Sequence, residues 1–473
     1  MLIKYYLGEV INMEENKEIK MEDIVQYCSQ YGFIYQGSEI YGGLANTWDY
    51  GPLGARLKNN IKDEWRYYFI QNRENAYELD SDILMNPKVW EASGHVKSFS
   101  DPLVDCRKCK VRYRVDKLIE SYDSELDVDL MTDDEMMEYI KINKVPCPKC
   151  GESDFTPLRE FNLMFQTNRG VTSQKQNVIY LRPENAQGEY VNYLNILRSM
   201  HAQIPFSIGQ IGKAFRNEIT PGNFTFRTIE FEQMEYQTFC KPGTDHDIYE
   251  FFKKYGMTFL EKLGLPENKL RYKNHEKLAH YAKEACDIEY LFPFGWGEIN
   301  GTHNRTDFDL SRHQEYSGKK MNYFDQKNRE KYIPYIIEST YGLDRITLAI
   351  LCESLTKQVD VNGAERTILK INSELAPIKV SILPLERKKH GDKAFKIYKD
   401  LRTKLMVYYD DKGNIGKRYR KSDAIGTPYS VCVDEETINN NTVTIRDRDT
   451  RDQFVISADN IENVLCKKLV KRR

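Results

Sequence analysis

One segment of the chain holds side chains that could bind a nucleotide. The segment FRNEITPGNFTFRTIEFEQMEYQTF alternates like two strands joined by a Pro-Gly turn, yet it carries charge where a core strand carries apolar side chains. Because strand side chains alternate between faces, Arg227, Phe231 and Glu235 share one face, and Arg216 shares one with Glu218. Guanidinium groups bind phosphate oxygens, an aromatic ring stacks on a base, and a carboxylate holds an amino group or a metal. The segment therefore predicts a nucleotide site, and the alternative is a solvated hairpin.

A further cation follows a glycine later in the chain. The segment YIPYIIESTYGLDRITLAILCESL is typical of a strand, a break at Gly342 and an apolar helix. Arg345 would then lie at the start of that helix, where backbone N–H groups already favour anions. This position makes Arg345 a second candidate for binding phosphate.

Four of the ten cysteines have the spacing of metal ligands. Cys106 and Cys109 form one C-x-x-C pair, and Cys147 and Cys150 form another, so two thiolate knuckles could surround a tetrahedral zinc ion. Four thiolates leave no open coordination position, so such a zinc would be structural rather than catalytic. The alternative is four free or redox-active thiols.

Length and composition indicate a folded protein of several domains. A chain of 473 residues suggests about three domains of about 150 residues each. The content of 40% hydrophobic, 30% charged and 12% aromatic residues is that of a globular protein rather than a disordered or membrane one. We expect no transmembrane span, no secretory signal and a cytoplasmic location. Residues 1–20 are expected to be a disordered extension.

Charge is distributed unevenly along the chain. From Pro377 to Arg473 there are 22 Lys and Arg against 14 Asp and Glu, a balance of +8, whereas the rest of the chain carries −10. A basic module joined to an acidic body favours binding of a polyanion by the C-terminal part. The alternative is a chance asymmetry of solvated surfaces.

Periodicity predicts the elements that position these groups. Residues 52–72 have apolar side chains at helical spacing, with a proline suited to the first turn. Short alternating segments over 178–240 favour an antiparallel sheet. Between the cysteine pairs, Thr132 and Glu135 have the spacing of a helix capping box. The chain after Ala376 is typical of a separate α/β domain: a strand, a helix, the basic loop GKRYRKSDAIGTP and three strands.

Several segments resemble a known family. GPLGARLKNNIKDEW, FRNEITPGNFTFRTIEFEQME and GLDR resemble the three motifs of class II aminoacyl-tRNA synthetases. LRPENAQG, FPFGWGEI, RTDFDL and GKRYRKSDAIGTP are similar to segments of the glycyl-tRNA synthetase family of the single-chain homodimeric type. The resemblance covers about residues 22–464. No G-x-x-x-x-G-K-[ST] phosphate loop and no class I HIGH or KMSKS-like pair is present in the sequence.

The resemblance implies an α+β fold: a class II antiparallel-sheet catalytic domain, a Cys-rich insertion and a C-terminal α/β anticodon-binding domain. It implies ATP-dependent attachment of glycine to tRNA(Gly) through a glycyl-adenylate. It also implies a homodimer formed through the Pro52 helix, with no membrane or DNA partner. The implied domains are 21–105 with 155–375 for catalysis, 106–154 for the insertion and 376–473 for the anticodon.

For ATP, the resemblance implies that Arg216 holds the α-phosphate, Arg345 holds the γ-phosphate and Phe231 stacks on adenine. Arg216, Glu218 and Arg345 are the implied catalytic set, and Mg²⁺ is expected near Glu218 and Glu298. The full implied ATP set is Arg216, Asn217, Glu218, Phe226, Arg227, Phe231, Glu298, Ile299, Gly342 and Arg345.

For glycine, the resemblance implies a cage of three carboxylates around the ammonium group, at Glu184, Glu235 and Glu338. Because one methyl group changes binding by only about 1–3 kcal/mol, alanine must be excluded sterically, and no editing domain is expected. The full implied glycine set is Arg114, Glu184, Phe231, Gln233, Glu235, Glu338, Thr340 and Gly342.

Several residues depart from the family or have an open role. Relatives have Glu-Pro-Ser where this chain has Glu338, Ser339 and Thr340, although Thr340 still offers a hydroxyl. His303 is expected to be structural. Arg114, beside a cysteine pair, fits a substrate contact or a structural role.

For tRNA, the resemblance implies phosphate contacts from one basic cluster and stacking on unpaired bases by two tyrosines. The implied phosphate contacts are Lys417, Arg418, Arg420 and Lys421, and the tyrosines are Tyr419 and Tyr429.

Two other interpretations of the sequence stay open. One is a class II enzyme for another amino acid, such as proline, threonine or histidine, and the other is a non-catalytic RNA-binding paralogue.

Overall fold

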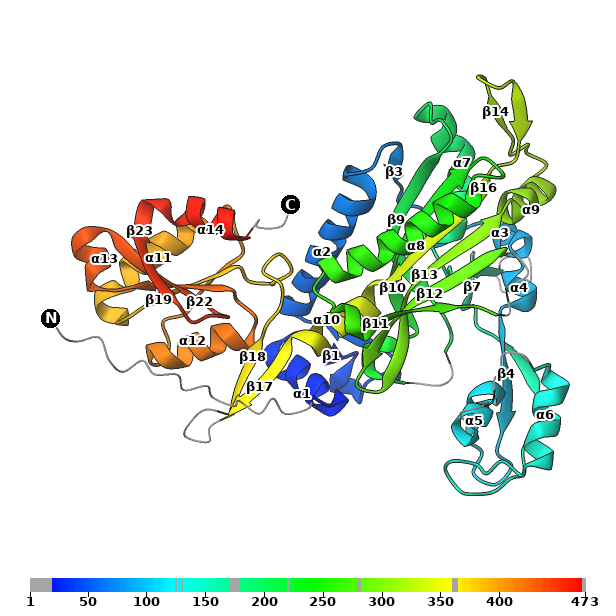
Figure 1. Ribbon diagram of the computed structural model, residues 1–473. Coiled ribbons are helices and arrows are strands. Elements are labelled where there is room, and N and C mark those ends of the chain that lie inside the picture. Colours follow the sequence, from blue (N-terminus) through cyan, green and yellow to red (C-terminus); the bar gives the residue numbers. More distant parts are fainter. Residues whose placement is uncertain are drawn as a thin grey trace. The chain divides into compact units, whose positions relative to one another are not determined.

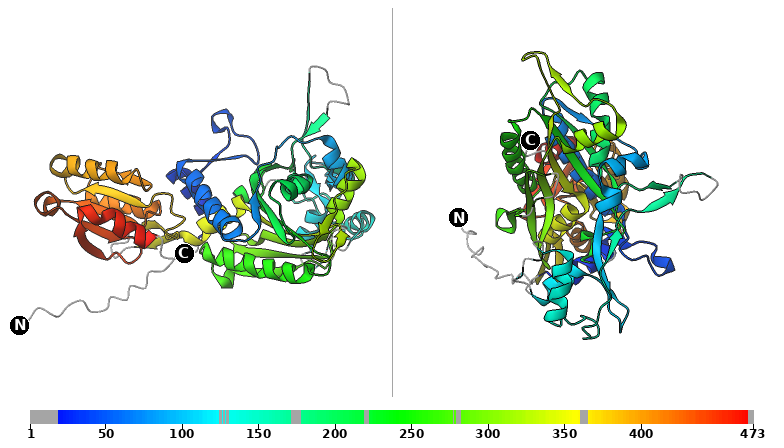
Figure 2. Two further views of the ribbon diagram at one scale, coloured as in Figure 1. Left: turned by 90° about the horizontal axis from the view of Figure 1, so that it is seen from above. Right: turned by 90° about the vertical axis from the view of Figure 1, so that its right-hand side faces the viewer.

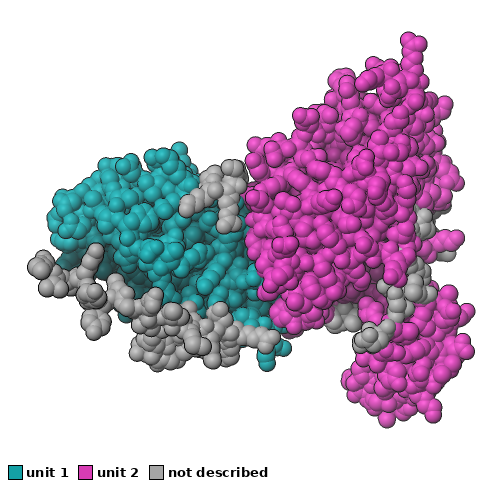
Figure 3. All heavy atoms as spheres, viewed as in Figure 1, with its two compact units in different colours: residues 1–35, 49–61, 349–473 teal, residues 36–48, 62–348 magenta. Residues whose placement is uncertain are grey.

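In the computed structural model of the chain, two compact units are distinguished (Figure 3). These units do not follow the predicted domains one for one, so the domain boundaries stay predictions. Of the predicted extension 1–20, only residues 19 and 20 are among the described residues. No helix in the described part of the chain is long and apolar enough to cross a membrane. The described residues are 19–123, 126, 128, 131–170, 178–218, 222–276, 278, 282–359 and 365–469. The first unit comprises residues 1–35, 49–61 and 349–473, and the second comprises 36–48 and 62–348.

The second unit is built on a seven-stranded sheet in the order β11-β12-β13-β16-β10-β9-β3 (Figure 1). All neighbours are antiparallel except β3 and β9, which run parallel. This sheet confirms the predicted antiparallel α+β fold. Its strands are β3 (Ala76–Glu78), β9 (Phe206–Phe215), β10 (Glu230–Cys240), β11 (Leu270–Asn274), β12 (Glu284–Phe292), β13 (Gly295–Thr306) and β16 (Tyr335–Gly342).

Helices cover both faces of this sheet (Figure 2). α8 (Asp245–Lys262) packs on β13 and β16, and α7 (Ala186–Ser199) packs on β9 and β10. The prediction of short strands throughout 178–240 was wrong at α7. There, buried Ala186, Tyr190 and Tyr193 recur every three or four residues, which is the helical rather than the strand period.

The predicted helix over 52–72 is confirmed and ends in a wider turn. α2 (Pro52–Arg66) continues as a π-helical turn, Tyr67–Gln71. Trp65 and Phe69 are fully buried, and the Phe69 ring lies 5.3 Å from that of Tyr236. A Cβ at Gly209 of β9 would lie 2.9 Å from Trp65 and 2.7 Å from Ile70, so only glycine permits this close approach.

The Cys-rich segment has its own small core. A three-stranded sheet in the order β5-β4-β6 carries two helices. The predicted capping box is confirmed, because the Thr132 side chain accepts from Glu135 N at the start of the second helix and Glu135 bonds back to Thr132 N. The elements are β4 (Ser100–Asp105), β5 (Arg112–Arg114), β6 (Arg159–Asn162), α5 (Val115–Tyr122) and α6 (Asp133–Ile142).

In the first unit, a mixed five-stranded sheet in the order β20-β19-β21-β22-β23 confirms the predicted C-terminal α/β arrangement. The predicted basic loop was wrong, because that segment forms helix α12. Asn414 caps this helix at Lys417 N, and Arg418 and Ser422, four residues apart, are buried. The strands are β19 (Val380–Pro384), β20 (Val407–Tyr409), β21 (Tyr429–Val433), β22 (Thr442–Asp447) and β23 (Gln453–Ser457), and the helices are α11 (Arg387–Leu401), α12 (Ile415–Ala424), α13 (Glu435–Asn440) and α14 (Ile461–Leu469).

The remaining elements are short helices and two-stranded ribbons. Their bounds are α1 (Met21–Tyr31), α3 (Pro87–Ala92), α4 (His95–Ser98), α9 (Phe308–Ser317), α10 (Leu343–Ser354), β1 (Ile34–Gln36), β2 (Trp48–Tyr50), β7 (Gln166–Asn168), β8 (Val178–Tyr180), β14 (Tyr323–Asp325), β15 (Glu330–Tyr332), β17 (Leu355–Val359) and β18 (Glu365–Leu369).

Candidate active site

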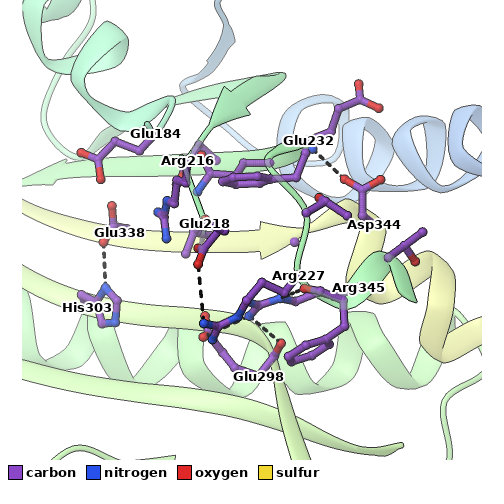
Figure 4. Close-up of a pocket in the computed structure, with 18 of the residues that line it drawn as sticks. Glu184, Arg216, Glu218, Arg227, Glu232, Glu298, His303, Glu338, Asp344 and Arg345 are labelled. Carbon is purple, nitrogen blue, oxygen red and sulfur yellow. Dashed lines mark hydrogen bonds and ion pairs between the residues drawn. The ribbon is translucent and has the colours of Figure 1, made fainter. Parts of the chain in front are cut away.

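A pocket opens over the middle strands of the large sheet, on the face that α7 covers (Figure 4). The register of β10 against β16 pairs Gln233 with Gly342 and Glu235 with Thr340, so side chains from the two strands lie side by side. The predicted break at Gly342 is confirmed, and α10 begins at the next residue, which brings Arg345 to the pocket.

Most of the predicted site residues meet in this pocket. Arg216 and Glu218 follow β9 rather than lying in it, and the predicted turn residue Pro221 lies outside the described residues. The predicted residues that line the pocket are Glu184, Arg216, Glu218, Phe226, Arg227, Phe231, Gln233, Glu235, Glu298, Glu338, Thr340, Gly342 and Arg345.

Arg216, Arg227 and Arg345 occupy one end of the pocket, and the last two contact carboxylates. Arg227 Nη1 lies 3.6 Å from Glu218 Oε2, and Arg345 Nη1 lies 3.1 Å from Glu298 Oε2 (Figure 4). Ion pairs that water reaches are weak, so an incoming phosphate can replace the carboxylates. This end of the pocket is therefore suited to a polyphosphate.

Aromatic rings lie beside these cations. The Arg216 guanidinium carbon lies 5.3 Å from the centre of the Phe231 ring, and that of Arg345 lies 4.3 Å from the centre of the Phe226 ring. Both rings line the pocket, so a base has an aromatic surface next to the phosphate-binding end.

The other end of the pocket is lined by buried carboxylates, and Glu338 is the most strongly bonded of them. His303 Nδ1 lies 2.7 Å from Glu338 Oε2, and Arg305 Nη1 lies 3.2 Å from the same oxygen. Burial alone would raise the pKa of Glu338, but Arg305 and His303 outweigh it and lower that pKa to about 2. Glu338 is therefore ionised and already neutralised by protein cations.

Glu235 differs from Glu338 because no arginine or histidine among the described residues forms an ion pair with it. Its bonds run to neutral groups: Gln237 Nε2 lies 3.4 Å from its carboxylate, and the Thr340 hydroxyl also bonds to it. Burial, followed by the negative charge of Glu338, holds the pKa of Glu235 well above its usual range. The raised pKa favours the protonated form of Glu235 in the free protein, and a bound cation would favour its ionised form.

Glu184 completes the set. Its carboxylate lies 3.4 Å from His95 Nε2 and accepts a hydrogen bond from Gln187 at 3.0 Å. Burial would raise the pKa of Glu184, but His95, and to a lesser degree Arg305, hold it well below its usual range. The three carboxylates thus form a buried acceptor for one small cation.

Three predicted residues do not line the pocket. Ile299 is 1% exposed and its side chain belongs to the core, so its assignment to the ATP site stays a prediction. Asn217 donates its backbone N–H to Leu163 O. Arg114 forms ion pairs with Asp101 at 3.1 Å and Asp116 at 2.6 Å, which supports a structural role.

Some residues that line the pocket were not predicted as site residues from the sequence. His303 was expected to be structural, but it lines the pocket together with Arg305, which was not proposed at all. Alternation along β13 places both on one strand face and could have indicated them. Asp344 accepts a hydrogen bond from Glu232 N at 2.7 Å and so joins β10 to the start of α10 (Figure 4).

Comparison with known proteins gives the family. The model described as tRNA synthetase class II core domain (G, H, P, S and T) matches residues 165–354, and that of the anticodon binding domain matches residues 379–468. The chain is 51% identical over 458 residues to a glycine–tRNA ligase of Caldanaerobacter subterraneus subsp. tengcongensis, which covers 96% of this chain and 99% of the relative. The chain belongs to the glycine–tRNA ligase family.

Other glycine–tRNA ligases are equally similar over nearly full length. That of Clostridium kluyveri is 50% identical over 459 residues, which are 96% of this chain and 99% of the relative. That of Geobacillus thermodenitrificans is 49% identical over 465 residues, which are 97% of this chain and 100% of the relative. The predicted family and the class II fold are thereby confirmed.

In this member of the glycine–tRNA ligase family, the two cysteine pairs converge. The four Sγ atoms all lie within 4.8 Å of one another, with Cys106 to Cys150 and Cys109 to Cys147 both at 3.6 Å. Ligands of a tetrahedral zinc ion at about 2.3 Å would be separated by about 3.8 Å, so the cluster fits zinc. Tyr113 lies behind it, its hydroxyl 3.3 Å from the sulfur of Cys147.

The part of the chain that matches the anticodon binding domain corrects the predicted tRNA contacts. On α12, Lys417 and Arg420 are exposed, whereas Arg418 is 3% exposed and donates to the carbonyls of Pro384, Asp410 and Leu385. The prediction that Arg418 contacts phosphate was therefore wrong.

Three further residues in this part differ in their surroundings. Tyr429 is 7% exposed, so the prediction that its ring stacks on a base was wrong as well. Lys421 is exposed and bonds to Tyr408 at 2.7 Å and Asp410 at 3.3 Å. Tyr419 is half-buried, with the Arg446 guanidinium 5.1 Å from its ring centre.

Proposed function

We propose that this chain attaches glycine to tRNA(Gly) in two ATP-dependent steps through a glycyl-adenylate. Membership of the glycine–tRNA ligase family supports the proposal. The observation that carries it is the pocket itself, in which a group of arginines adjoins a cage of buried carboxylates. Such a pocket binds a triphosphate and an ammonium group next to each other.

In the first step, ATP lies over the sheet with its phosphates among the arginines. Arg216 holds the α-phosphate, Arg345 the γ-phosphate, and Arg227 lies beside the triphosphate, while Phe231 stacks on adenine. The carboxylate of glycine attacks the α-phosphorus, and pyrophosphate leaves. Positioning and neutralisation of developing charge are sufficient for this step, so no general base is assigned.

Magnesium is proposed to accompany ATP. Glu218 and Glu298 both face the phosphate-binding end, and Glu218 Oε2 is buried without a hydrogen bond within the described residues. Hard carboxylate oxygens of this kind suit Mg²⁺, and these two residues would hold it. The ion supplies additional charge neutralisation on the phosphates.

Glycine is bound by the carboxylate cage. The entering ammonium group favours the ionised form of Glu235, while Glu184 and Glu338, each held by protein cations, complete the wall of the cage. Ion pairs with His303 and Arg305 fix the Glu338 side chain, so it does not move readily to make room for a larger substrate. Exclusion of alanine follows from a lack of room for a Cβ rather than from weaker attraction.

In the second step, a terminal ribose hydroxyl of tRNA attacks the glycyl carbonyl, and AMP leaves. The exposed cations of α12, Lys417 and Arg420, contact anticodon-arm phosphates. We further propose a cytoplasmic homodimer paired through α2 and one structural zinc ion held by the cysteine cluster.

The direct test is charging of tRNA(Gly) by the full chain with each of the common amino acids and ATP. Glycine alone is expected to form an aminoacyl-tRNA. Charging with proline, threonine or histidine would indicate a different class II specificity. A complete lack of charging, together with retained tRNA binding, would indicate a non-catalytic paralogue.

A further inference from the structure

A second hollow lies away from the carboxylate cage, between α3, α7 and α9. Its volume is about 580 Å³, which falls in the range of small-molecule sites. These helices lie next to one another at one end of the large sheet (Figure 1). The hollow is therefore a candidate binding site lined by neighbouring helices.

The rim of this hollow is cationic. Lys88, Arg198, Lys319 and Lys320 line it and are exposed, and none of them has an acidic partner within the described residues. No Asp or Glu is among the described residues of its lining. In a chain with a net charge of −2, four such cations around one hollow favour an anionic ligand.

The floor of the hollow is apolar. Val89, Val191, Leu194 and Met321 line it, and Tyr316, whose side chain is 42% exposed, stands beside them. Free phosphate alone would leave this floor uncovered, and a nucleic acid backbone needs an extended basic stripe rather than a concave apolar floor. The combination fits a compact ligand that has both a flat apolar body and several negative charges.

One wall of the hollow is connected to the carboxylate cage. His313 Nε2 lies 2.9 Å from Gln187 Oε1, and Gln187 Nε2 donates to Glu184 at 3.0 Å. Substitution of His313 would therefore disturb both sites. Arg198 and Lys320 at the rim have no such link within the described residues and are suitable for testing the hollow alone.

We propose that the hollow between α3, α7 and α9 binds a phosphorylated small molecule with an aromatic body, of the class of nucleoside polyphosphates. The phosphates contact the lysines and arginine of the rim, and the aromatic body lies on the apolar floor next to Tyr316. This site is separate from the pocket in which ATP and glycine react, and its existence does not depend on the proposed function.

The test is calorimetric titration of the full chain with guanosine diphosphate, while the active-site pocket is filled with a stable glycyl-adenylate analogue that carries no polyphosphate and so leaves the hollow open. We expect one saturable site per chain. Guanosine, which lacks the charge, and inorganic phosphate, which lacks the apolar body, should each bind at least about tenfold more weakly.

The decisive comparison is between charge reversals at and away from the hollow. The double variant Arg198→Glu, Lys320→Glu should weaken guanosine diphosphate binding at least about tenfold, whereas Lys254→Glu, an exposed lysine on α8, should change it less than about twofold. Circular dichroism and the melting temperature establish that the variants are folded. Equal binding by the double variant, absence of a saturable site, or binding of an RNA duplex in place of the nucleotide would overturn the proposal. If the wild-type chain does not charge tRNA(Gly), that result contradicts the proposed function but leaves the proposal for this site unaffected.

Discussion

His303 Nδ1 lies 2.7 Å from Glu338 Oε2 in the wall of the proposed glycine pocket. Asp287 lies on the other side of the same imidazole, 3.9 Å from its Nε2, and the His275 ring is 6.0 Å away. Burial would lower the pKa of His303, but its bonds to Asp287 and Glu338 outweigh burial and raise that pKa to about 10. His303 is therefore a buried cation that fixes a buried carboxylate.

This pairing predicts a pH-dependent effect of His303→Gln. Because the folded-state pKa is raised, the imidazolium contributes its full stability below its unfolded pKa of about 6.5, and the contribution disappears as the pH rises through about 10. The variant should be about 1–3 kcal/mol less stable than wild type at pH 6, and the difference should vanish above pH 10. Urea unfolding from pH 6 to pH 10 measures it. A difference that stays constant over this range would show that His303 is not charged in the fold.

The phosphate-binding end predicts that Arg345→Lys impairs the use of ATP. Lysine keeps the charge but cannot form the planar fork that Arg345 presents beside Phe226. The ratio kcat/KM for ATP in ATP–pyrophosphate exchange should fall at least about tenfold. Arg271→Lys, at an exposed arginine paired with the buried Glu289, is the control and should retain the wild-type value. If both variants keep full activity, Arg345 does not bind the triphosphate.

The cysteine cluster predicts one zinc ion per chain. Elemental analysis of the purified protein should find this stoichiometry, and Cys106→Ser should abolish it, because three thiolates hold zinc less tightly than four. Cys466→Ser, on α14 and outside the cluster, should leave it unchanged. Zinc that is absent from the wild type, or that persists in Cys106→Ser, would indicate ordinary thiols.

Substitutions of Lys417 and Arg418, which are neighbours on α12, are expected to affect different properties of the protein. Lys417→Glu replaces an exposed positive charge with a negative one, so the KM for tRNA should rise at least about tenfold while ATP–pyrophosphate exchange and the melting temperature stay unchanged. Arg418→Met leaves buried carbonyls of Pro384, Asp410 and Leu385 without their donor, so it should cost about 2–4 kcal/mol of stability. Charging kinetics and urea unfolding separate the two effects. A stable Arg418→Met with a raised KM for tRNA would contradict the assignment.

Sequence reasoning succeeded where a local pattern determines the structure. The alternation of Phe231, Gln233 and Glu235 placed them on one strand face, and the break at Gly342 placed Arg345 at a helix start. The sequence pattern gave a wrong prediction where the burial of a side chain determines its role. Arg418 has the composition of a surface cation, and only the tertiary structure shows that it is enclosed by carbonyl groups.

The role of Arg305 also depends on the fold. It lies 33 residues before Glu338, and no local period joins them. The antiparallel pairing of β13 with β16 brings their side chains together. Likewise, the sequence indicated three equivalent glutamates. In the structure the pKa of Glu235 is raised, whereas those of Glu338 and Glu184 are lowered, because the cations contact Glu338 and Glu184.

The most direct test of the account is ATP–pyrophosphate exchange by Glu235→Gln, with glycine and with alanine. Glutamine has the shape of the protonated carboxyl but cannot become an anion, so the variant should be at least as stable as wild type. Its kcat/KM for glycine should fall at least about 100-fold, and neither protein should activate alanine. Glu230→Gln, an exposed carboxylate on the same strand, should behave as wild type. Near-normal glycine activation by Glu235→Gln would contradict the carboxylate cage.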